Sequence, residues 1–334
     1  MIYTYHRLLN FLNLTFGYIL SRITRKVNQR GLPFALSIEP TNCCNLHCPE
    51  CPSGLKTLTR ERGYIDRELF TKIIDQLHQS LLYLTFYFQG EPFLHPGFFE
   101  MVKYAKEKHI FVSTSTNGHF LSEFNANAAI GSGLDQLIIS LDGIDQESYS
   151  SYRKGGSFEK VVDGIQKMTT LKKEMGSVKP RVILQFLVLK PNQHEVEQVK
   201  RLGTWLGADK VSVKSAQFYN FENGNPLMPE PGRYSRYRKR KVTRDHVVYE
   251  LKNKLPRHCF RMRGSCVITW DGWVVPCCFD KDAIYKFGNV SEKSFREIWK
   301  APIYSEFRQK ILSSRESIGL CRNCTEGMGL SLII

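Results

Sequence analysis

The chain has 334 residues, of which 42% are hydrophobic and 24% are charged. These values are typical of folded globular proteins and exclude a disordered chain, a collagen and a small disulfide-stabilised scaffold. No apolar run reaches the length of about 18 residues that a transmembrane helix needs. The net charge of +15 favours an acidic partner such as nucleic acid, anionic lipid or an anionic small molecule.

The first segment, residues 1–33, is predicted to form an amphipathic helix. One face of this helix would carry Leu8, Leu12, Phe16, Ile19, Ile23 and Val27, and basic residues gather at its end. Two arrangements fit this stripe: packing on the rest of the protein, or contact with a membrane surface. Asn10 and Asn13 interrupt the apolar run and no cleavage site follows it, so we predict no export signal. We therefore expect a cytoplasmic protein, with peripheral contact to the inner face of the membrane as an open alternative.

Residues 34–216 alternate short apolar runs with amphipathic segments. The predicted strands cover residues 34–39, 83–88, 110–115, 136–141, 181–189 and 210–214. The predicted helices lie between them, at residues 66–79, 97–108, 123–131, 157–175 and 193–206. Asp66 and Ser157 can cap the first and fourth of these helices. The alternation predicts an α/β fold with a parallel sheet, either open or closed into a barrel.

Residues 217–256 differ in composition and are predicted to be a basic linker. Asn, Gly and Pro are concentrated at its start, and a basic run with two tyrosines follows from Arg233 to Arg244. Basic residues interleaved with aromatic ones can bind nucleic acid. We favour a solvated face instead, because no nucleic-acid-binding fold accompanies the run.

Three cysteines follow the first predicted strand within eight residues: Cys44, Cys48 and Cys51. A loop this short directs its thiols to a common point. Structural zinc sites usually use four nitrogen or sulfur ligands, and His47 would have to be the fourth. Three thiolates suit a [4Fe–4S] cluster with one open iron, because a cubane cluster takes one thiolate per iron. We therefore favour an iron–sulfur cluster over zinc.

The last segment, residues 257–334, contains a second group of cysteines. Asp271 and Gly272 occupy the turn of a predicted hairpin, and helices are predicted at residues 294–300 and 302–311. The hairpin can bring four thiols together with no open position: Cys259, Cys277, Cys321 and Cys324. A structural zinc is one interpretation of such a set.

The motifs after successive strands resemble those of the radical S-adenosylmethionine (radical SAM) superfamily. They read Cys44-x3-Cys48-x2-Cys51, Gln89-Gly90-Glu91-Pro92, Thr116-Asn117-Gly118 and Ser140-Leu141-Asp142-Gly143. The second is similar to the family's GGEP motif, with Gln in place of the first Gly. One departure is Glu50, where many relatives carry an aromatic residue. Each motif lies at the C-terminal end of a strand, the edge at which α/β barrels build active sites.

This resemblance implies a partial (β/α)6 barrel in which three cysteines and SAM share a [4Fe–4S] cluster. Reductive cleavage of SAM would give a 5′-deoxyadenosyl radical that abstracts hydrogen from a substrate. Gly90 and Glu91 would meet the amino group of SAM, and Asn117 would lie near its nucleoside. Ser140 and Arg153 would meet its carboxylate, for which a guanidinium is a natural partner.

The C-terminal cysteines resemble the SPASM/Twitch appendage of the same superfamily, in its shorter form with one auxiliary [4Fe–4S] cluster. The resemblance implies an electron donor such as flavodoxin or ferredoxin. The substrate would be a peptide to be modified or a small molecule, such as a sugar alcohol or a lipid-linked compound, to be dehydrogenated, and the two classes stand equal. Cys43 and Cys266 are interpreted as free thiols. Cys278 and Asp280 stand where some relatives carry a proposed base.

A function of another class stays open beside this one. The chain could be a non-enzymatic iron–sulfur or zinc protein that binds nucleic acid through its basic linker. Glu91, Ser140 and Arg153 argue against it, because a metal scaffold has no use for groups that bind SAM. Nucleic acid is therefore not the partner that we expect.

Overall fold

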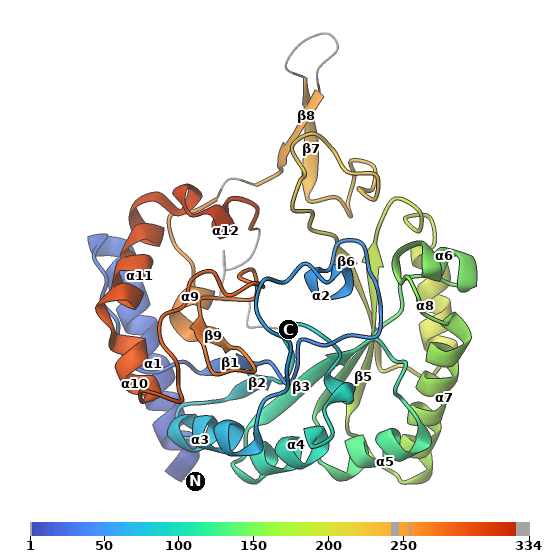
Figure 1. Cartoon of the computed structure of the whole chain (residues 1–334), viewed down its shortest axis with the longest axis horizontal. Coiled ribbons are helices and arrows are strands. Elements are labelled where there is room, and N and C mark those ends of the chain that lie inside the picture. Colours follow the sequence, from blue (N-terminus) through green and yellow to red (C-terminus); the bar gives the residue numbers. More distant parts are fainter. Residues whose placement is uncertain (1, 242–246, 254, 325–334) are drawn as a thin grey trace. The chain divides into compact units, whose positions relative to one another are not determined.

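The computed structural model describes residues 2–241, 247–253 and 255–324 (Figure 1). The end of the predicted basic run, residues 242–246, and the last residues of the C-terminal segment lie outside this range. The chain forms two compact units: residues 1–43, 58–113 and 255–334 make the first, and residues 44–57 and 114–254 make the second. Within the described residues, no helix is long and apolar enough to cross a membrane.

The strands of the first unit lie in the order β10-β9-β1-β2-β3. Their bounds are β1 Ala35–Ile38, β2 Tyr83–Thr85, β3 Phe111–Thr116, β9 Ser265–Ile268 and β10 Val274–Val275. The pairs β1–β2, β2–β3 and β1–β9 are parallel, whereas β9 and β10 form the predicted antiparallel hairpin. The C-terminal hairpin thus extends the sheet beside β1, with Ile38 opposite Ile268.

The helices of this unit include two short ones, at residues 261–264 and 319–322, that were not predicted, and the other helices after residue 60 begin and end near the predicted residues. The helices of the unit are α1 Ile2–Thr24, α3 Arg67–Leu77, α4 Phe98–Glu107, α9 Arg261–Gly264, α10 Phe295–Lys300, α11 Pro302–Ser314 and α12 Gly319–Arg322, with 3-10 turns at Pro92–Leu94 and Arg315–Ser317. Asp66 caps α3 by accepting from the backbone N–H of Glu68 and Leu69, as expected. Phe86 stacks on Phe98 at 4.8 Å between ring centroids, which packs α4 on the sheet.

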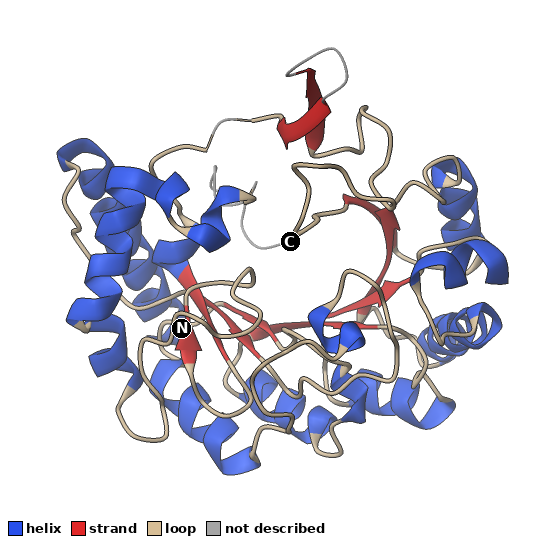
Figure 2. Cartoon of the chain, turned by 45° about the horizontal axis from the view of Figure 1, so that its top comes forward, coloured by secondary structure: helices blue, strands red, loops and turns tan. Residues whose placement is uncertain are grey.

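The second unit repeats the β–α pattern with helices outside the strands (Figure 2). Its strands β4 Gln136–Ser140, β5 Arg181–Val188 and β6 Lys210–Ser215 are parallel neighbours. Its helices are α2 Pro52–Leu55, α5 Glu123–Gly131, α6 Gln146–Tyr152, α7 Phe158–Glu174 and α8 Val196–Trp205. Ser157 caps α7 as predicted. Helix α6 was not predicted.

The segment predicted as a basic linker contains an antiparallel hairpin of β7 Tyr237–Lys241 and β8 Val247–Leu251. Tyr237 is buried and its ring stacks on Phe221 at 4.8 Å. The three residues after this tyrosine, Arg238, Lys239 and Arg240, are exposed, so the run reads as polar although Tyr237 is packed. The burial of an aromatic ring among charged neighbours explains why composition alone indicated a linker.

Candidate functional site

The cysteine loop of residues 44–51 is held in the second unit by a short helix and by buried apolar groups. The N–H of Leu55 donates to the carbonyl of Cys51 at 2.8 Å. A Cβ atom on Gly54 would lie only 2.6 Å from the backbone nitrogen of Cys48, so this turn packs directly on the loop. The side chain of Cys48 is buried in a cluster that includes Leu46 and Phe218. The loop is therefore fixed at its centre.

Arg153, directly after α6, lies against this loop. Its Nε donates to Asp142 Oδ2 at 2.6 Å, and the Asp142 side chain is fully buried. Asp142 also accepts from the N–H of Leu187 at 2.7 Å, which fixes the carboxylate on the sheet. The Nη1 atom of Arg153 lies 4.0 Å from the sulfur of Cys48. Burial raises the pKa of the Cys48 thiol, and the charge of Arg153 opposes that rise.

Two asparagines also meet the loop. Asn117 donates from Nδ2 to Asn45 at 2.7 Å, and the same nitrogen lies 3.9 Å from the sulfur of Cys44. Asn225, which belongs to the predicted linker, donates to Glu50 Oε1 at 2.9 Å. Of these residues, Asn117 was expected from the sequence, whereas Asn45 and Asn225 were not. No sequence signal marks Asn225, because it lies 175 residues from its partner.

Gly90 and Glu91 lie in the first unit, where they are joined to the residues that precede the cysteine loop. Gly90 has a φ of +75°, and a Cβ atom there would lie 2.5 Å from the carbonyl oxygen of Thr41 and 2.6 Å from that of Cys43. The N–H of Glu91 donates to the Cys43 carbonyl at 2.7 Å. Glu91 is buried and one of its carboxylate oxygens accepts from the N–H of Phe93. Only glycine fits this close approach of two backbones.

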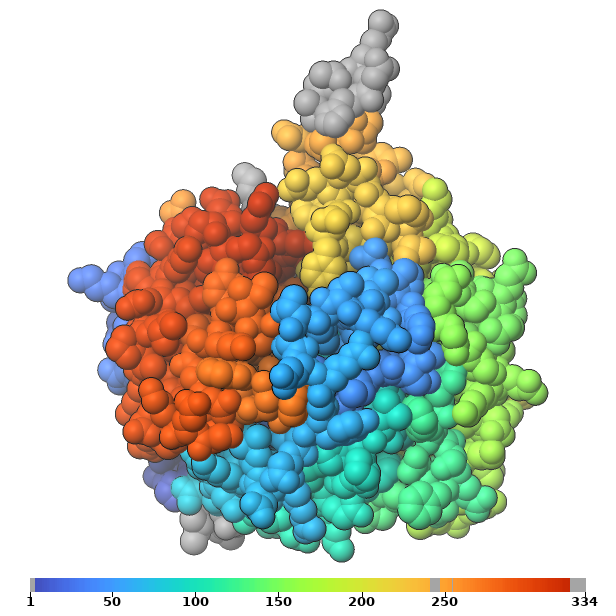
Figure 3. All heavy atoms as spheres, in the orientation of Figure 1, coloured from blue at the N-terminus to red at the C-terminus, as the bar shows by residue number. Residues whose placement is uncertain are grey.

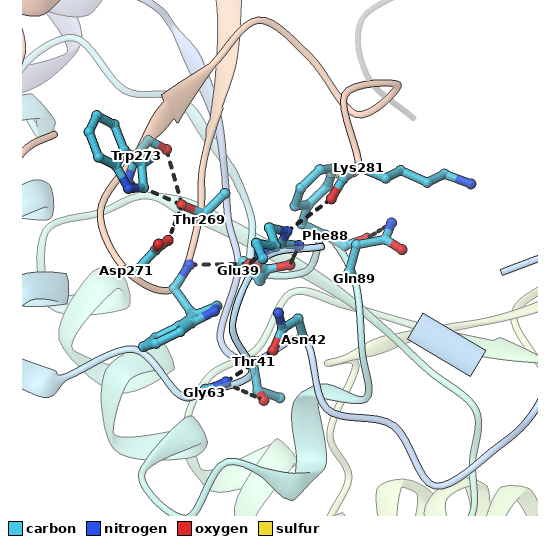
Figure 4. A network of polar contacts seen from close by, with 12 residues as sticks. Glu39, Thr41, Asn42, Gly63, Phe88, Gln89, Thr269, Asp271, Trp273 and Lys281 are labelled. Atoms are coloured by element: carbon cyan, nitrogen blue, oxygen red, sulfur yellow. Dashed lines mark hydrogen bonds and ion pairs between the residues drawn. The ribbon is translucent and has the colours of Figure 1, made fainter. Parts of the chain in front are cut away.

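A buried ion pair joins the end of β1 to the segment that contains Arg60 (Figure 4). The guanidinium of Arg60 makes two bonds of 2.5 Å to the carboxylate of Glu39, whose side chain is fully buried. The N–H of Trp270, at the turn between β9 and β10, also donates to Glu39. Arg60 Nε donates to the carbonyl of Lys281 at 3.0 Å. These bonds hold the strand end, the hairpin and the loop after Cys277 together.

The four C-terminal cysteines lie in the first unit close enough to affect one another electrostatically. Burial raises the pKa of Cys277, and the thiols of Cys278, Cys259 and Cys324 raise it further. Burial likewise raises the pKa of Cys321 to about 12, with the thiols of Cys259 and Cys324 adding to the effect. None of these four cysteines forms a disulfide. A metal would have to displace their protons to bind them.

A buried cation accompanies these thiols. Arg315, in the 3-10 turn before α12, donates to the sulfur of Cys324 at 3.3 Å and to the carbonyl of His258 at 2.7 Å. Its charge favours the ionised form of the nearby thiols. Four thiols with no carboxylate among them and a cation beside them fit the anionic thiolate shell of an iron–sulfur cluster. Among the described residues, no three His, Cys, Asp or Glu side chains are arranged to hold a single metal ion.

The remaining cysteines have structural surroundings. Cys266 is buried, and Cys43 is half-buried with its backbone paired as described above. The sulfur of Cys278 accepts from Arg261 Nη1 at 2.9 Å. The two carboxylate oxygens of Asp280 accept from the N–H groups of Ile284 and Tyr285 at 2.8 and 2.9 Å. Asp280 thus caps a loop.

The family comparisons agree with this arrangement. The sequence model of the radical SAM superfamily matches residues 38–202, and that of the iron–sulfur cluster-binding SPASM domain matches residues 259–325. A cofactor-modifying protein for tungsten-containing aldehyde ferredoxin oxidoreductase from Pyrococcus furiosus is 29% identical over 82% of this chain and 82% of its own. PqqA peptide cyclase from Gluconobacter oxydans is 26% identical over 83% and 79%. The solved structure of SuiB from Streptococcus suis bound to S-adenosylmethionine is 15% identical, covers 92% of this chain and 75% of its own, and has a TM-score of 0.63.

The fold and the two thiol groups define an iron–sulfur enzyme that uses SAM, built on an α/β partial barrel. The chain belongs to the radical SAM superfamily and carries a SPASM domain at its C-terminal end. Its cofactors are therefore SAM, the [4Fe–4S] cluster of that superfamily and an additional iron–sulfur centre in the SPASM domain. The expected fold class, family and cofactors are confirmed.

Proposed function

We propose that this enzyme abstracts a hydrogen atom from a peptide and thereby modifies it. The observation that carries the proposal is the position of Arg153 beside the three-thiol loop, with one edge fixed by Asp142 and Nη1 near Cys48. A guanidinium so placed suits the carboxylate of SAM. A structural zinc site has no need for such a group.

Cys44, Cys48 and Cys51 would hold the SAM-binding cluster. When bound and reduced, this cluster supplies the electron that cleaves SAM into methionine and the 5′-deoxyadenosyl radical. Arg153, together with Ser140 at the end of β4, would bind the carboxylate of SAM. The buried apolar groups around Cys48 would keep water from the reacting centre.

Gly90, Glu91 and Asn117 would complete the SAM site. The turn at Gly90 presents backbone groups beside residues 41–43, and a backbone carbonyl or the Glu91 carboxylate can accept from the amino group of SAM. Asn117 would orient the loop through Asn45 and face the nucleoside. These three residues would position SAM without taking part in bond cleavage.

Cys259, Cys277, Cys321 and Cys324 would hold one auxiliary [4Fe–4S] cluster. Arg315 would offset the negative charge of their thiolates. Flavodoxin or ferredoxin is the class of electron donor that we propose. The cytoplasm is the place of action that we propose, because none of the ten cysteines forms a disulfide.

A peptide substrate is favoured because PqqA peptide cyclase, which the chain matches over most of its length, is named for a peptide. The test uses anaerobically reconstituted enzyme with SAM, dithionite and a short peptide encoded beside its gene. We expect 5′-deoxyadenosine to appear together with a peptide that has lost hydrogen. A deuterated peptide should transfer deuterium into 5′-deoxyadenosine.

Cys44→Ala is the matched negative control, because it removes one proposed cluster ligand and nothing else. Small molecules such as sugar alcohols are tested in parallel. If deuterium enters 5′-deoxyadenosine from a deuterated sugar alcohol and from no peptide, the enzyme dehydrogenates a small molecule and the peptide proposal is wrong.

A further inference from the structure

Helix α1 packs on the first unit through a narrow face that is not its apolar stripe. The buried side chains on this face are Arg7, Leu14, Tyr18 and Ser21. Arg7 donates hydrogen bonds of 2.7 to 3.0 Å to the carbonyls of His78, Lys108 and His109, at the C-terminal ends of α3 and α4. A cation at these helix ends is favourable, so Arg7 fixes which way α1 faces.

The opposite face of α1 leaves its apolar side chains in solvent. Those at least 49% exposed are Tyr5, Leu8, Leu12, Phe16, Ile19 and Ile23. They follow one another at helical spacing from Tyr5 to Ile23, a length of about 27 Å within the helix of 23 residues. The sequence left open whether this stripe packs on the protein or meets a membrane, and the structure does not bury it. A row of this extent differs from singly scattered apolar residues and marks a surface for interaction.

The charged side chains on α1 and in the segment directly after it are of one sign. The chain has no Asp or Glu before Glu39. The exposed basic residues at the end of α1 are Arg22, Arg25, Lys26 and Arg30. The guanidinium of Arg30 lies 5.0 Å from the centre of the Phe16 ring, so apolar and cationic groups are contiguous. Figure 3 shows this N-terminal segment at the surface beside the C-terminal helices.

A cavity of about 240 Å³ opens at the same end of the helix. Its lining combines two apolar side chains, two guanidinium groups and an imidazole: Ile19, Ile23, Arg22, Arg25 and His258. Tyr18 donates to or accepts from His258 Nδ1 at 2.8 Å, which holds the imidazole in the wall. None of the five lining residues is acidic, so an anion with an apolar neighbour fits this cavity.

We propose that α1 lies flat on an anionic membrane surface and that the cavity at its end takes the phosphate of a lipid headgroup. The stripe would enter the boundary between headgroups and acyl chains, and the basic residues would meet the negative surface potential. A second copy of the chain is the weaker occupant, because the same face of that copy would bring a second set of cations beside Arg22, Arg25, Lys26 and Arg30 and no acidic group from residues 1–38. This inference goes beyond the radical chemistry and does not depend on it.

The test is co-sedimentation of the full-length, cluster-loaded protein with vesicles. One set contains phosphatidylcholine alone, and the other contains phosphatidylcholine with 30% phosphatidylglycerol. We expect binding to the anionic set that weakens as salt rises. Arg22→Gln/Arg25→Gln should lower the partition coefficient on these vesicles roughly 30-fold, since each basic group near the surface contributes a factor of about five.

A second variant removes the stripe instead of the charges. Leu12→Ser/Phe16→Ser/Ile19→Ser should lower binding at least about 100-fold, because three apolar side chains no longer leave water. The matched control is Phe124→Ser, which changes a side chain that is 80% exposed on α5 and should leave binding unchanged. Circular dichroism checks that each variant keeps its helices.

Three outcomes would overturn the proposal. The first is an absence of binding to either vesicle set, and the second is equal binding to both. The third is that wild type forms a dimer in sedimentation velocity without lipid and the triple Ser variant of the stripe is a monomer, while both bind vesicles equally. Inorganic phosphate is added as a competitor for vesicle binding, with chloride at equal ionic strength as its control. If phosphate displaces the protein from anionic vesicles no better than chloride does, the cavity takes a lipid headgroup and not a soluble phosphate.

Discussion

The ion pair between Glu39 and Arg60 offers the sharpest test of how the protein holds the end of β1. The exposed fractions of the Arg60 and Glu39 side chains are 5% and 0%, and two bonds of 2.5 Å join them. Arg60→Met leaves a buried carboxylate that still accepts from the N–H of Trp270 but has lost its cation. Breaking a buried pair from one side costs about 3–5 kcal/mol in the free energy of unfolding.

The pH dependence of this loss has a definite sign. Burial raises the pKa of Glu39, and Arg60 and the Trp270 N–H oppose that rise. Arg60→Met removes the largest opposing effect, so the pKa of Glu39 rises further. An acid whose pKa is raised on folding costs stability as pH rises from its unfolded pKa through its folded pKa. The deficit of the variant should therefore be larger at pH 8 than at pH 5.

Urea unfolding followed by circular dichroism measures this deficit. Glu39→Gln/Arg60→Met should recover at least half of it, because the neutral amide carries no buried charge and still accepts from Trp270. Lys200→Met is the control: it breaks a pair at 2.6 Å whose side chains are 45% and 70% exposed, and should cost less than about 1 kcal/mol. The reasoning would be refuted if Arg60→Met lost no more unfolding free energy than Lys200→Met. It would also be refuted if the loss in Arg60→Met were the same at pH 5 and pH 8.

Three further predictions concern the cofactor sites. Gly90→Ala should lower the free energy of unfolding by about 2 kcal/mol or more and reduce iron loading, because a Cβ atom there combines a positive φ with a steric clash. Gly155→Ala is the control for the backbone conformation alone, because Gly155 has a φ of +80° and nothing lies within 4 Å of its Cβ position. Equal effects of the two substitutions would exclude a contribution from the clash. Arg153→Met should weaken SAM binding about tenfold or more in calorimetry, with partial recovery in Arg153→Lys, and unchanged affinity would remove Arg153 from the site. Protein lacking Cys44, Cys48 and Cys51 should retain about four irons per chain, and zinc in their place would replace the auxiliary cluster by a structural zinc site.

The elements that sequence periodicity predicts well are those in which local and tertiary preferences agree. Strands β4 and β5 are buried apolar runs, and α3 and α7 begin at capping residues, so each was placed within one or two residues. Gly90 was singled out from the sequence by the resemblance of residues 89–92 to the GGEP motif, and its positive φ beside another backbone explains why glycine stands there.

Pairings between distant segments were not predictable in the same way. Glu39 meets Arg60 across 21 residues, and Asn225 meets Glu50 across 175, with no periodic pattern to mark either contact. The stripe on α1 was visible, but its orientation was not. That orientation depends on Arg7, which caps two helix ends, and on Leu14 and Tyr18, which pack in a cluster with Phe34 and Phe260.

The central claim is that this chain cleaves SAM at a cluster on its three-cysteine loop. The most direct measurement is the release of 5′-deoxyadenosine by anaerobically reconstituted protein with dithionite and SAM, quantified by chromatography. Wild type and Cys43→Ala should both release it, because Cys43 lies next to the motif but outside it, whereas Cys48→Ala should release none. Release by Cys48→Ala at the wild-type rate, or no release by reconstituted wild type, would contradict the account.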